Sequence, residues 1–215
     1  MRIKWIGKYN GNNLPVVPIK DSNKVLPSVT IKHTFTIIPI LLLMGVLVYL
    51  KNNVLDERII FSRELLAVGF LIGIALFPLH EILHALCFPT GSDVFLFYTR
   101  QGLGTTCTTP ITRNRFIVIN IIPSAILGMI PLLLYLIIPK GYTAFSTILF
   151  AVAFLHIGGS YADYVNIAHL LRLPAKSFIQ ISGENIYWNT DIYILFQPYC
   201  IHQYPLQSRS HLKLN

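Results

Sequence analysis

The chain has 215 residues, of which 53% are hydrophobic and only 12% carry a charge. A soluble domain has roughly 25% charged residues, so this composition excludes an ordinary soluble domain or a disordered chain and indicates a membrane protein. The formal net charge is +8. The basic residues lie at the edges of the apolar stretches and form no aromatic-interleaved stripe, which favours the lipid bilayer over nucleic acid as a partner.

The apolar stretches predict the membrane-spanning part of the chain. Residues 1–33 are rich in Lys and Arg and have no apolar core, so we expect a retained N-terminal segment and no cleavable signal peptide. Four later stretches reach or approach the roughly 20 residues that a helix needs to cross a bilayer. They are residues 34–50, 65–88, 116–138 and 144–171. We therefore predict an all-α membrane protein, a bundle of about four transmembrane helices.

The distribution of Lys and Arg predicts which side each connection faces. These residues concentrate in the N-terminal segment, in the loop at residues 89–115 and in the tail after the last stretch, and they are scarce elsewhere. By the positive-inside rule, both termini and this loop are predicted to be cytoplasmic. The predicted organisation is a cytoplasmic segment (1–33), a transmembrane domain with the loop (34–171) and a cytoplasmic tail with short strands (172–215).

Two segments outside the apolar stretches predict short strands. Residues 93–99 are aromatic and β-branched, Gln-Gly-Leu-Gly at 101–104 offers a turn, and residues 105–112 are rich in Thr, which is typical of a β-hairpin. In the tail, residues 182–185 are predicted as a turn between two extended segments. We expect a small cytoplasmic β-hairpin and a short extended C-terminal segment beside the helices.

Residues 80–84 read His-Glu-Ile-Leu-His within the second apolar stretch. Histidines four positions apart lie on one face of a helix, so His80 and His84 can bind one tetrahedral ion. Glu81 can then contact a water on the metal without being a ligand itself. This spacing suits zinc, Zn²⁺. The alternative is a polar cluster that only holds helices together.

Asp163 is a second acid within the apolar stretches, and the last three of these contain no Lys or Arg. An ionised side chain at mid-membrane is opposed by roughly 2.5–3.5 kcal/mol. One Zn²⁺ facing Asp163 and Glu81 would leave no net charge, so Asp163 is the predicted third ligand. On a continuous helix it would lie at the same depth as His80. The alternative is a protonated acid bonded to Tyr164 or Ser160.

Further polar residues are candidates for substrate contacts. Asn120 is the first candidate for a hydrogen bond to the developing oxyanion or the substrate backbone, and His156 is the second. Their alternatives are an interhelical hydrogen bond for Asn120, as for Asn166, and a satisfied core position for His156. Cys87 is interpreted as a buried thiol.

Three prolines interrupt the apolar stretches. Pro78, Pro123 and Pro131 are expected to kink their helices and to free backbone groups. Such breaks are tolerated where a water-filled cavity lies alongside. The sequence is thus compatible with a water-filled cavity that leads to the predicted metal site.

An H-E-x-x-H helix with an acidic ligand two spans later resembles the site-2 protease group of intramembrane zinc metalloproteases. Over roughly residues 60–190 the chain more closely resembles a bacterial membrane family described as putative zincin peptidases. The matching residues are 80–88, 120–123, 158–163 and 173–174. Asp163 is followed by Tyr164, which departs from the Asp-Gly pair of the site-2 pattern. The resemblance implies a zinc peptidase of the bacterial cytoplasmic membrane.

We predict an integral membrane zinc metalloprotease of site-2-like type. It would hydrolyse a peptide bond near the cytoplasmic side, in a membrane-embedded or membrane-adjacent protein substrate. Zinc would be held by His80, His84 and Asp163, and Glu81 would pass a proton from water to the leaving amine. The edge of the hairpin at residues 93–112 could bind the substrate. The alternative is a non-enzymatic membrane protein whose zinc site is structural or serves transport or regulation.

Overall fold

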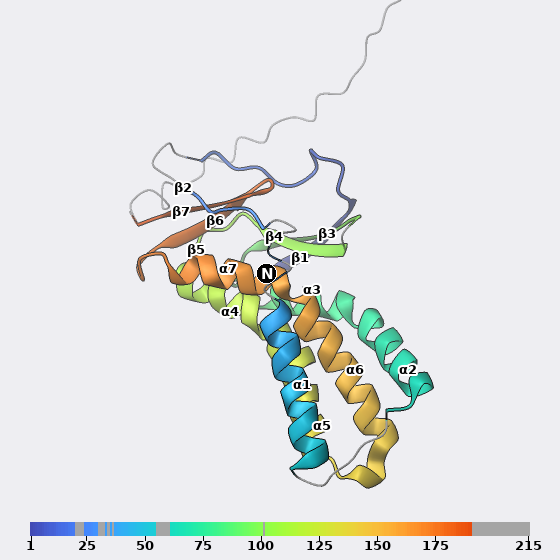
Figure 1. Cartoon of the computed structure of the whole chain (residues 1–215). Helices are drawn as coiled ribbons and strands as arrows, with labels where there is room; N and C mark the ends of the chain where they lie inside the picture. The colour runs from blue at the N-terminus through green and yellow to red at the C-terminus, as the bar shows by residue number, and fades with distance from the viewer. Residues whose placement is uncertain are drawn as a thin grey trace, which may run out of the picture.

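The structure is a computed structural model that describes residues 1–19, 24–29, 33, 35, 37–54, 61–100 and 102–190. It consists of a stem of helices and, on one end of the stem, a layer of short strands (Figure 1). Within the described residues, three helical segments are long and apolar enough to cross a membrane, namely Arg63–Leu86, Arg113–Ile137 and Lys140–Gly159. The apolar helix α1 (Ile37–Asn53) is shorter. The predicted bundle of about four transmembrane helices is therefore not confirmed.

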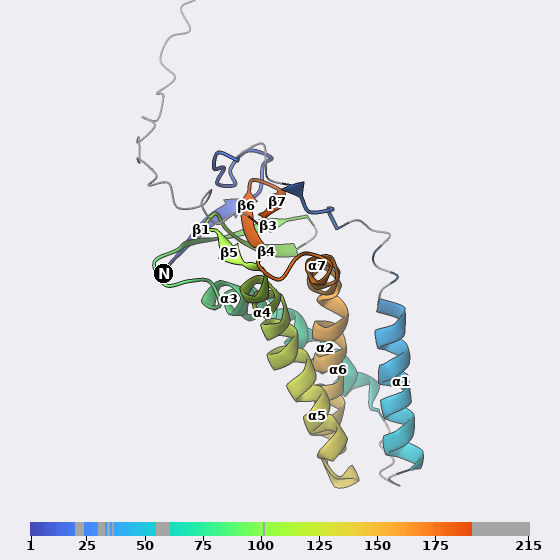
Figure 2. The ribbon, with the colours of Figure 1, turned by 90° about the vertical axis from the view of Figure 1, so that its left-hand side faces the viewer.

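Three interruptions divide the helical part of the described chain. The elements in chain order are α2 (Arg63–Ala75), α3 (Phe77–Leu86), α4 (Arg113–Ser124), the π-helical turn η2 (Ala125–Met129), α5 (Ile130–Ile137), the 3-10 turn η3 (Lys140–Tyr142), α6 (Thr143–Gly159) and α7 (Tyr161–Leu171). The elements α3, α4 and α7 lie together at the end of the stem, next to the strands (Figures 1 and 2). The remaining helices form the stem proper.

Two of these interruptions occur where the prolines predict them. Pro78 occupies the first turn of α3, directly after the end of α2. Pro123 lies inside α4 and Pro131 in the first turn of α5, so the two prolines flank η2. A proline removes one backbone donor and crowds the preceding turn, which favours the wider π-helical turn here.

The third interruption contradicts the predicted single helix over residues 144–171. Helix α6 ends at Gly159, and α7 runs across the stem, so Figure 2 shows it end-on. The backbone of Ser160 leaves the α-helical region at φ −79° and ψ 16°. The helix ends after two consecutive glycines, Gly158 and Gly159, and glycine is a poor helix former, so little helix stability is lost at this point. Asp163 consequently lies on α7 and not within a spanning helix.

Close contact between α2 and α6 holds the centre of the stem. A Cβ atom at Gly69 would lie 2.6 Å from the Cβ of Ala151, and one at Gly73 would lie 2.7 Å from a methyl group of Leu155. Glycines four residues apart let two helix backbones approach closely, which is how helices associate in lipid. Helix α5 packs against the same helix α6.

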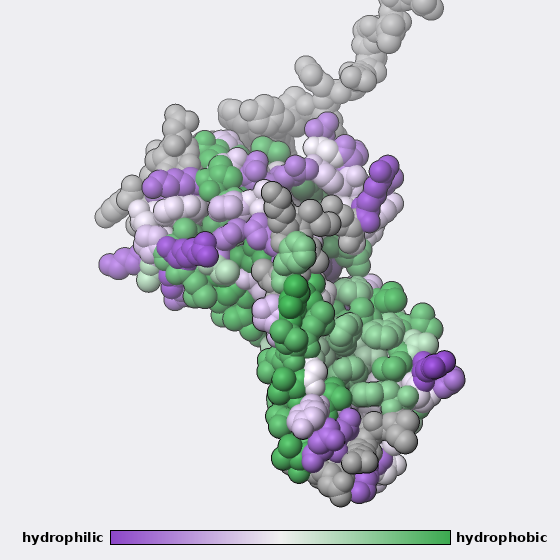
Figure 3. Space-filling view, viewed as in Figure 1, coloured by the Kyte–Doolittle hydropathy of each residue, from purple (hydrophilic) through white to green (hydrophobic). Residues whose placement is uncertain are grey.

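A buried lysine fastens α1 to this stem. The Nζ of Lys51 donates to the carbonyl oxygens of Tyr135, of Leu136 at 3.3 Å and of Ile138 at 2.6 Å. These carbonyls belong to the end of α5, where they have no partner within the helix. The positive charge also complements the negative end of the helix dipole. Polar residues gather at this end of the stem and on the strand layer, with apolar residues between them (Figure 3).

The strand layer contains two small sheets. Their strands are β1 (Arg2–Lys8), β3 (Asp93–Thr99) and β4 (Gly102–Cys107) in the first sheet, and β2 (Lys24–Val25), β7 (Asn185–Asn189), β6 (Phe178–Ser182) and β5 (Ile111–Thr112) in the second, each in spatial order. We call them sheet A and sheet B. The predicted hairpin is confirmed as β3 and β4, which pair antiparallel. The last residues of the predicted tail, 191–215, lie outside the described residues.

The hairpin glycines Gly102 and Gly104, predicted to form the turn, belong to strand β4. Three residues of the predicted turn, 102–104, lie within β4, so the strand begins inside the predicted turn, and Gln101 lies outside the described residues. A Cβ atom at Gly104 would lie 2.7 Å from the ring of its cross-strand partner Phe97. The predicted turn in the tail is confirmed, because Ser182 pairs with Asn185 across Gly183, whose φ is +58°.

A buried apolar cluster joins the strand layer to α3, α4 and α7. Its members are Ala85, Phe88, Val94, Cys107, Ile111, Phe116, Ile119, Leu170 and Ile179. Burial of such side chains is the main favourable term in folding. The cluster therefore fixes the three helices that carry the predicted site residues against the strands.

Candidate metal centre

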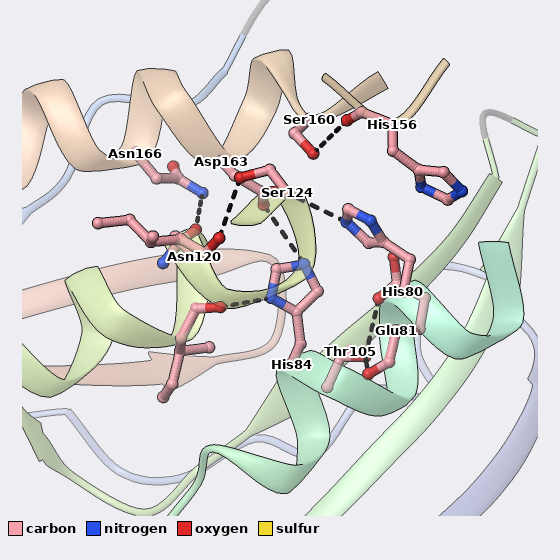
Figure 4. A network of polar contacts seen from close by, with 12 residues as sticks. His80, Glu81, His84, Thr105, Asn120, Ser124, His156, Ser160, Asp163 and Asn166 are labelled. Carbon is pink, nitrogen blue, oxygen red and sulfur yellow. Dashed lines mark hydrogen bonds and ion pairs between the residues drawn. The ribbon is translucent and has the colours of Figure 1, made fainter. Parts of the chain in front are cut away.

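His80, His84 and Asp163 come together from two helices. The histidines lie one turn apart on α3, and Asp163 lies in the first turn of α7. The Nε2 of His80 is 3.5 Å from Oδ2 of Asp163, and the Nε2 of His84 is 3.6 Å from Oδ1. Figure 4 shows the carboxylate turned toward both rings. Both imidazoles are buried, with 5% and 8% of their residue surface exposed.

The spacing of these atoms fits a shared metal ion better than direct hydrogen bonds. A charge-assisted N–H···O bond is roughly 2.7–2.9 Å long, which is well below both distances. Two ligand atoms about 2.0–2.1 Å from a tetrahedral zinc ion lie roughly 3.3–3.4 Å apart. The observed distances of 3.5 and 3.6 Å need only a small contraction to meet this value. The three residues can therefore hold zinc.

A proline on α4 explains how His84 is oriented. The Nδ1 of His84 lies 2.9 Å from the carbonyl oxygen of Ile119. A carbonyl only accepts, so Nδ1 carries the hydrogen and Nε2 keeps the lone pair that a metal needs. This carbonyl is four residues before Pro123, which has no N–H to bond to it. The kink that the sequence predicts thus supplies an acceptor for a candidate ligand.

Glu81 lies beside the histidines and is held by a strand. One ligand atom from each of His80, Glu81 and His84 lies within 4.8 Å of the others. The hydroxyl of Thr105 on β4 is 2.8 Å from Oε2 of Glu81 and 3.0 Å from its backbone oxygen. Sheet A thereby fixes the carboxylate next to the candidate ligands. The sequence did not identify Thr105, because the pairing of a loop threonine with α3 leaves no periodic signal.

Asn120 and Asn166 form one polar pair that lines the same cavity as the candidate ligands. The side-chain amide of Asn120 donates to the carbonyl oxygen of Phe116 at 2.7 Å, and its oxygen accepts from Asn166 at 3.4 Å. The pair joins α4 to α7, as an interhelical hydrogen bond would. One of the two N–H groups of Asn120 is left for another acceptor. Its predicted contact with an oxyanion stays a prediction.

His156 lies behind His80, away from Asp163. The rings of His156 and His80 are nearly parallel with centroids 5.7 Å apart, and the ring of Phe77 lies 5.1 Å from that of His156. Ser160 donates to the carbonyl oxygen of His156 at 2.8 Å. That bond uses the hydroxyl hydrogen of Ser160 and leaves its oxygen able to accept, so it does not decide whether a protonated Asp163 bonds to Ser160.

Two arginines at the start of α4 bind the ends of its neighbours. Arg113 donates to the carbonyl oxygen of Leu173, just after α7, at 2.7 Å. Arg115 donates to the carbonyl oxygen of Cys87, the last residue of the α3 turn, at 3.0 Å. Carbonyls at helix ends have no intrahelical partner, so they are good acceptors for a guanidinium. Helix α4 therefore holds α3 and α7 at a fixed distance.

The candidate ligands line one cavity of about 1050 Å³. His80, Glu81, His84, Asp163 and Asn120 line it from the helices. Residues 102–106 of β4 line another side, and the turn after β6 lies at a third. His156 is not among the lining residues that the structure describes. A polar site beside a large open space can admit both water and a polypeptide segment.

The fold and site define a class of protein, a mostly helical protein with candidate membrane-spanning helices and a candidate metal site at residues 80–84. Residues 73–178 match the model of a family described as "Putative zincin peptidase", and in this segment, which contains every candidate ligand, the chain is similar to that family. The description also implies zinc as the metal. No curated protein and no solved structure matches the chain.

Proposed function

We propose that the protein is an intramembrane zinc peptidase of site-2-like type. The observation that carries this proposal is the meeting of His80, His84 and Asp163 at distances that suit one zinc ion, beside Glu81 and a large cavity. Structural zinc sites are closed by four protein ligands, whereas catalytic sites have three and an open position. Three candidate ligands facing a cavity of about 1050 Å³ favour the catalytic kind.

The chemistry follows from what the side chains can do. When bound, zinc would polarise the scissile carbonyl and make water a stronger nucleophile at neutral pH. Glu81 takes a proton from the attacking water, whose oxygen bonds to the carbonyl carbon. The carbon–nitrogen bond then breaks, and Glu81 delivers the proton to the leaving amine. Water is consumed, and one carboxylate and one amine are produced.

Neighbouring groups would orient the reactants. The hydroxyl of Thr105, 2.8 Å from Glu81, keeps the carboxylate turned toward the cavity. The second N–H group of Asn120 is our candidate donor to the developing oxyanion or to the substrate backbone. Sheet A ends at β4, whose outer edge has no strand partner among the described residues. We propose that an extended substrate segment pairs with this edge.

The substrate would be a protein within or next to the membrane. The cavity is lined both by residues of the apolar helix junction, such as Phe77 and Gly159, and by strand residues. A segment leaving the bilayer could therefore reach Glu81 without crossing a polar barrier. From the excess of Lys and Arg on this side, we propose that the strand layer and both termini are cytoplasmic in a bacterial membrane.

The test uses the full chain in vesicles together with a library of single-span peptides, in water enriched in ¹⁸O. We expect fragments that carry one ¹⁸O at the new carboxyl end, detected by mass spectrometry. Glu81→Gln should retain zinc but lose cleavage by roughly 10²–10⁴-fold, because it removes the proton acceptor and spares the ligands. Glu64→Gln, at the far end of α2, is the matched control and should cleave like the wild type.

Two outcomes would contradict the proposal. Equal cleavage by wild type and Glu81→Gln would exclude Glu81 as the base. A zinc-loaded wild type that yields no fragments would favour the alternative function, a membrane protein with a structural, transport or regulatory zinc site.

A further inference from the structure

Sheet A has one face that rests on α3. Side chains of directly paired residues point to the same face of a sheet. Ile3 pairs with Val94, and Trp5 pairs with Leu96, which pairs in turn with Thr105. Because the hydroxyl of Thr105 contacts Glu81 on α3, this face is the one turned toward α3. The first strand thus points Ile3 and Trp5 toward the helical side of the molecule, and after a register shift Lys8, paired with Tyr98, lies on this face as well.

The part of this face formed by Ile3 and Trp5 is apolar and exposed. Helix α3 packs under β4 and β3, and β1 extends the sheet beyond them. Ile3 is 42% exposed and Trp5 is 59% exposed. Trp5 stacks on Tyr98 of β3, with ring centroids 6.0 Å apart and planes 12° from parallel. Exposed apolar groups that cluster mark an interaction surface.

The opposite face of β1 is basic. Arg2 and Lys4 alternate with Ile3 and Trp5, and both basic side chains bind Asp93 at 2.7 Å. Residues 2–5 of the strand are therefore amphipathic, with Ile3 and Trp5 toward the helices and the basic side chains on the other side, and Lys8 adds a positive charge at the end of the apolar face. This arrangement suits the boundary between acyl chains and anionic head groups.

This exposed face continues a surface that is already apolar. The outer side of α3 exposes Leu79, Ile82 and Leu86, at 40%, 36% and 56%. Helix α3 belongs to the segment Arg63–Leu86, which is apolar enough to cross a membrane. Figure 2 shows β1 above α3 at the same side of the molecule. A bilayer that covers this side of α3 would therefore reach β1 next.

We propose that the α3-side face of sheet A rests in the interfacial region of the bilayer, with Trp5 as its anchor. Tryptophan prefers this region, because its ring is apolar and its N–H can reach polar head groups. The contact sets the height of β4, and with it the height of Glu81, relative to the membrane surface. The proposal concerns the placement of the sheet and does not depend on peptidase activity.

The chain offers a clean test because it has only two tryptophans, Trp5 and Trp188. Trp188→Phe leaves Trp5 as the single fluorophore, and Trp5→Phe leaves Trp188, on β7 of sheet B, as the matched control. Each full-length variant is placed in phosphatidylcholine vesicles with and without acyl chains brominated near the head group. We expect Trp5 emission to be quenched by the brominated lipid, shifted to shorter wavelength and protected from aqueous iodide. Trp188 should be insensitive to the brominated lipid.

Several results would overturn the proposal. If Trp5 is quenched by iodide and not by brominated lipid, the face is in water. If Trp5 is shielded from both quenchers, another protein or a second copy of the chain covers it. Equal quenching of Trp5 and Trp188 by brominated lipid would also contradict it. Thermal unfolding of the variants in the same vesicles identifies any that fail to fold. If Trp5→Phe fails, Trp5→Tyr replaces it as the control, and the quenching of Trp188 by iodide and by brominated lipid is measured in that variant.

Discussion

The stem and the strand layer are held together by different kinds of contact. In the stem, α2 and α6 touch through glycines, and one buried lysine fastens α1 to α5. In the strand layer, segments far apart in the sequence meet, as β1 does with β3. The site lies at the junction, where α3 and α7 are turned out of the stem toward the strands. A rigid stem thus positions the candidate ligands, while the strand layer positions Glu81 and closes the cavity.

Removal of Lys51 should have the largest effect on the stem. Lys51→Met leaves the last carbonyls of α5 without their donor, so we expect a loss of about 2 kcal/mol in the free energy of unfolding. Unfolding by denaturant in detergent micelles measures it. Lys140→Met changes an exposed lysine at the same end of the stem and is the control. Equal stability of both variants would contradict a capping role for Lys51.

The close contact between α2 and α6 predicts the next effect. Gly69→Ala brings a Cβ atom against Ala151 and the backbone of Ile148, so the helices must separate. We expect a loss of roughly 1–3 kcal/mol in the same unfolding measurement. Gly45→Ala on α1 meets nothing within 4 Å and should be neutral or slightly stabilising. An equal change in the free energy of unfolding for Gly69→Ala and Gly45→Ala would contradict close packing of α2 against α6 at Gly69.

At the junction, Pro123 tests how the stem orients a ligand. Pro123→Ala restores an N–H that competes with His84 for the carbonyl oxygen of Ile119. We expect about a tenfold weaker affinity for zinc, measured by competition with a chelator. Pro131→Ala also restores an N–H, but the carbonyl four residues before it, that of Leu127, is bonded to no candidate ligand, so the affinity for zinc should be unchanged. An unchanged affinity in Pro123→Ala would show that the freed carbonyl is unimportant.

On the strand side of the junction, Thr105 should position Glu81. Thr105→Val removes the hydrogen bond at 2.8 Å, and we expect peptide turnover to fall roughly fivefold with little change in KM. Thr105→Ser retains the hydroxyl and should restore most of the turnover. If serine and valine are equally impaired, the residue serves packing only.

The smallest effect is expected within sheet A. Lys4 and Arg2 hold the pKa of Asp93 below its ordinary value, because both donate to its carboxylate. A lowered folded-state pKa means that the stabilisation is present above the unfolded-state pKa, about 3.9, and is lost as pH falls through the folded-state value. Asp93→Asn should remove it at neutral pH, at a cost of at most about 1 kcal/mol for an exposed pair.

Hydrogen exchange of the β1 amides measures this cost, with the amides of β6 as the internal control. Faster exchange should be confined to β1 in Asp93→Asn. Exchange that rises equally in both strands would mean that the ion pair stabilises the whole layer.

The sequence predicted the parts of the structure that depend on local patterns. The spacing of His80 and His84, the hairpin after α3 and the interruptions near Pro78 and Pro123 are all local features. The interruption at Ser160 was missed, because apolar composition continues through both α6 and α7. Asp163 nevertheless approaches the histidines, although the predicted straight helix was the wrong reason for it.

What the sequence could not predict depends on contacts between distant segments. The parallel pairing of β1 with β3 joins residues about ninety positions apart, and the short alternation of basic and apolar residues at 2–5 does not indicate which strand is its partner. The contact of Thr105 with Glu81 depends on how sheet A sits on α3. Such tertiary placement leaves no periodicity in the chain, so only the structure reveals it.

The zinc content of the purified protein tests the central claim most directly. Elemental analysis by mass spectrometry should find one zinc per chain in the wild type and in Glu81→Gln, and almost none in Asp163→Ala. A wild type without zinc, or an Asp163→Ala variant that retains the full amount, would contradict the assignment of His80, His84 and Asp163 as the ligands.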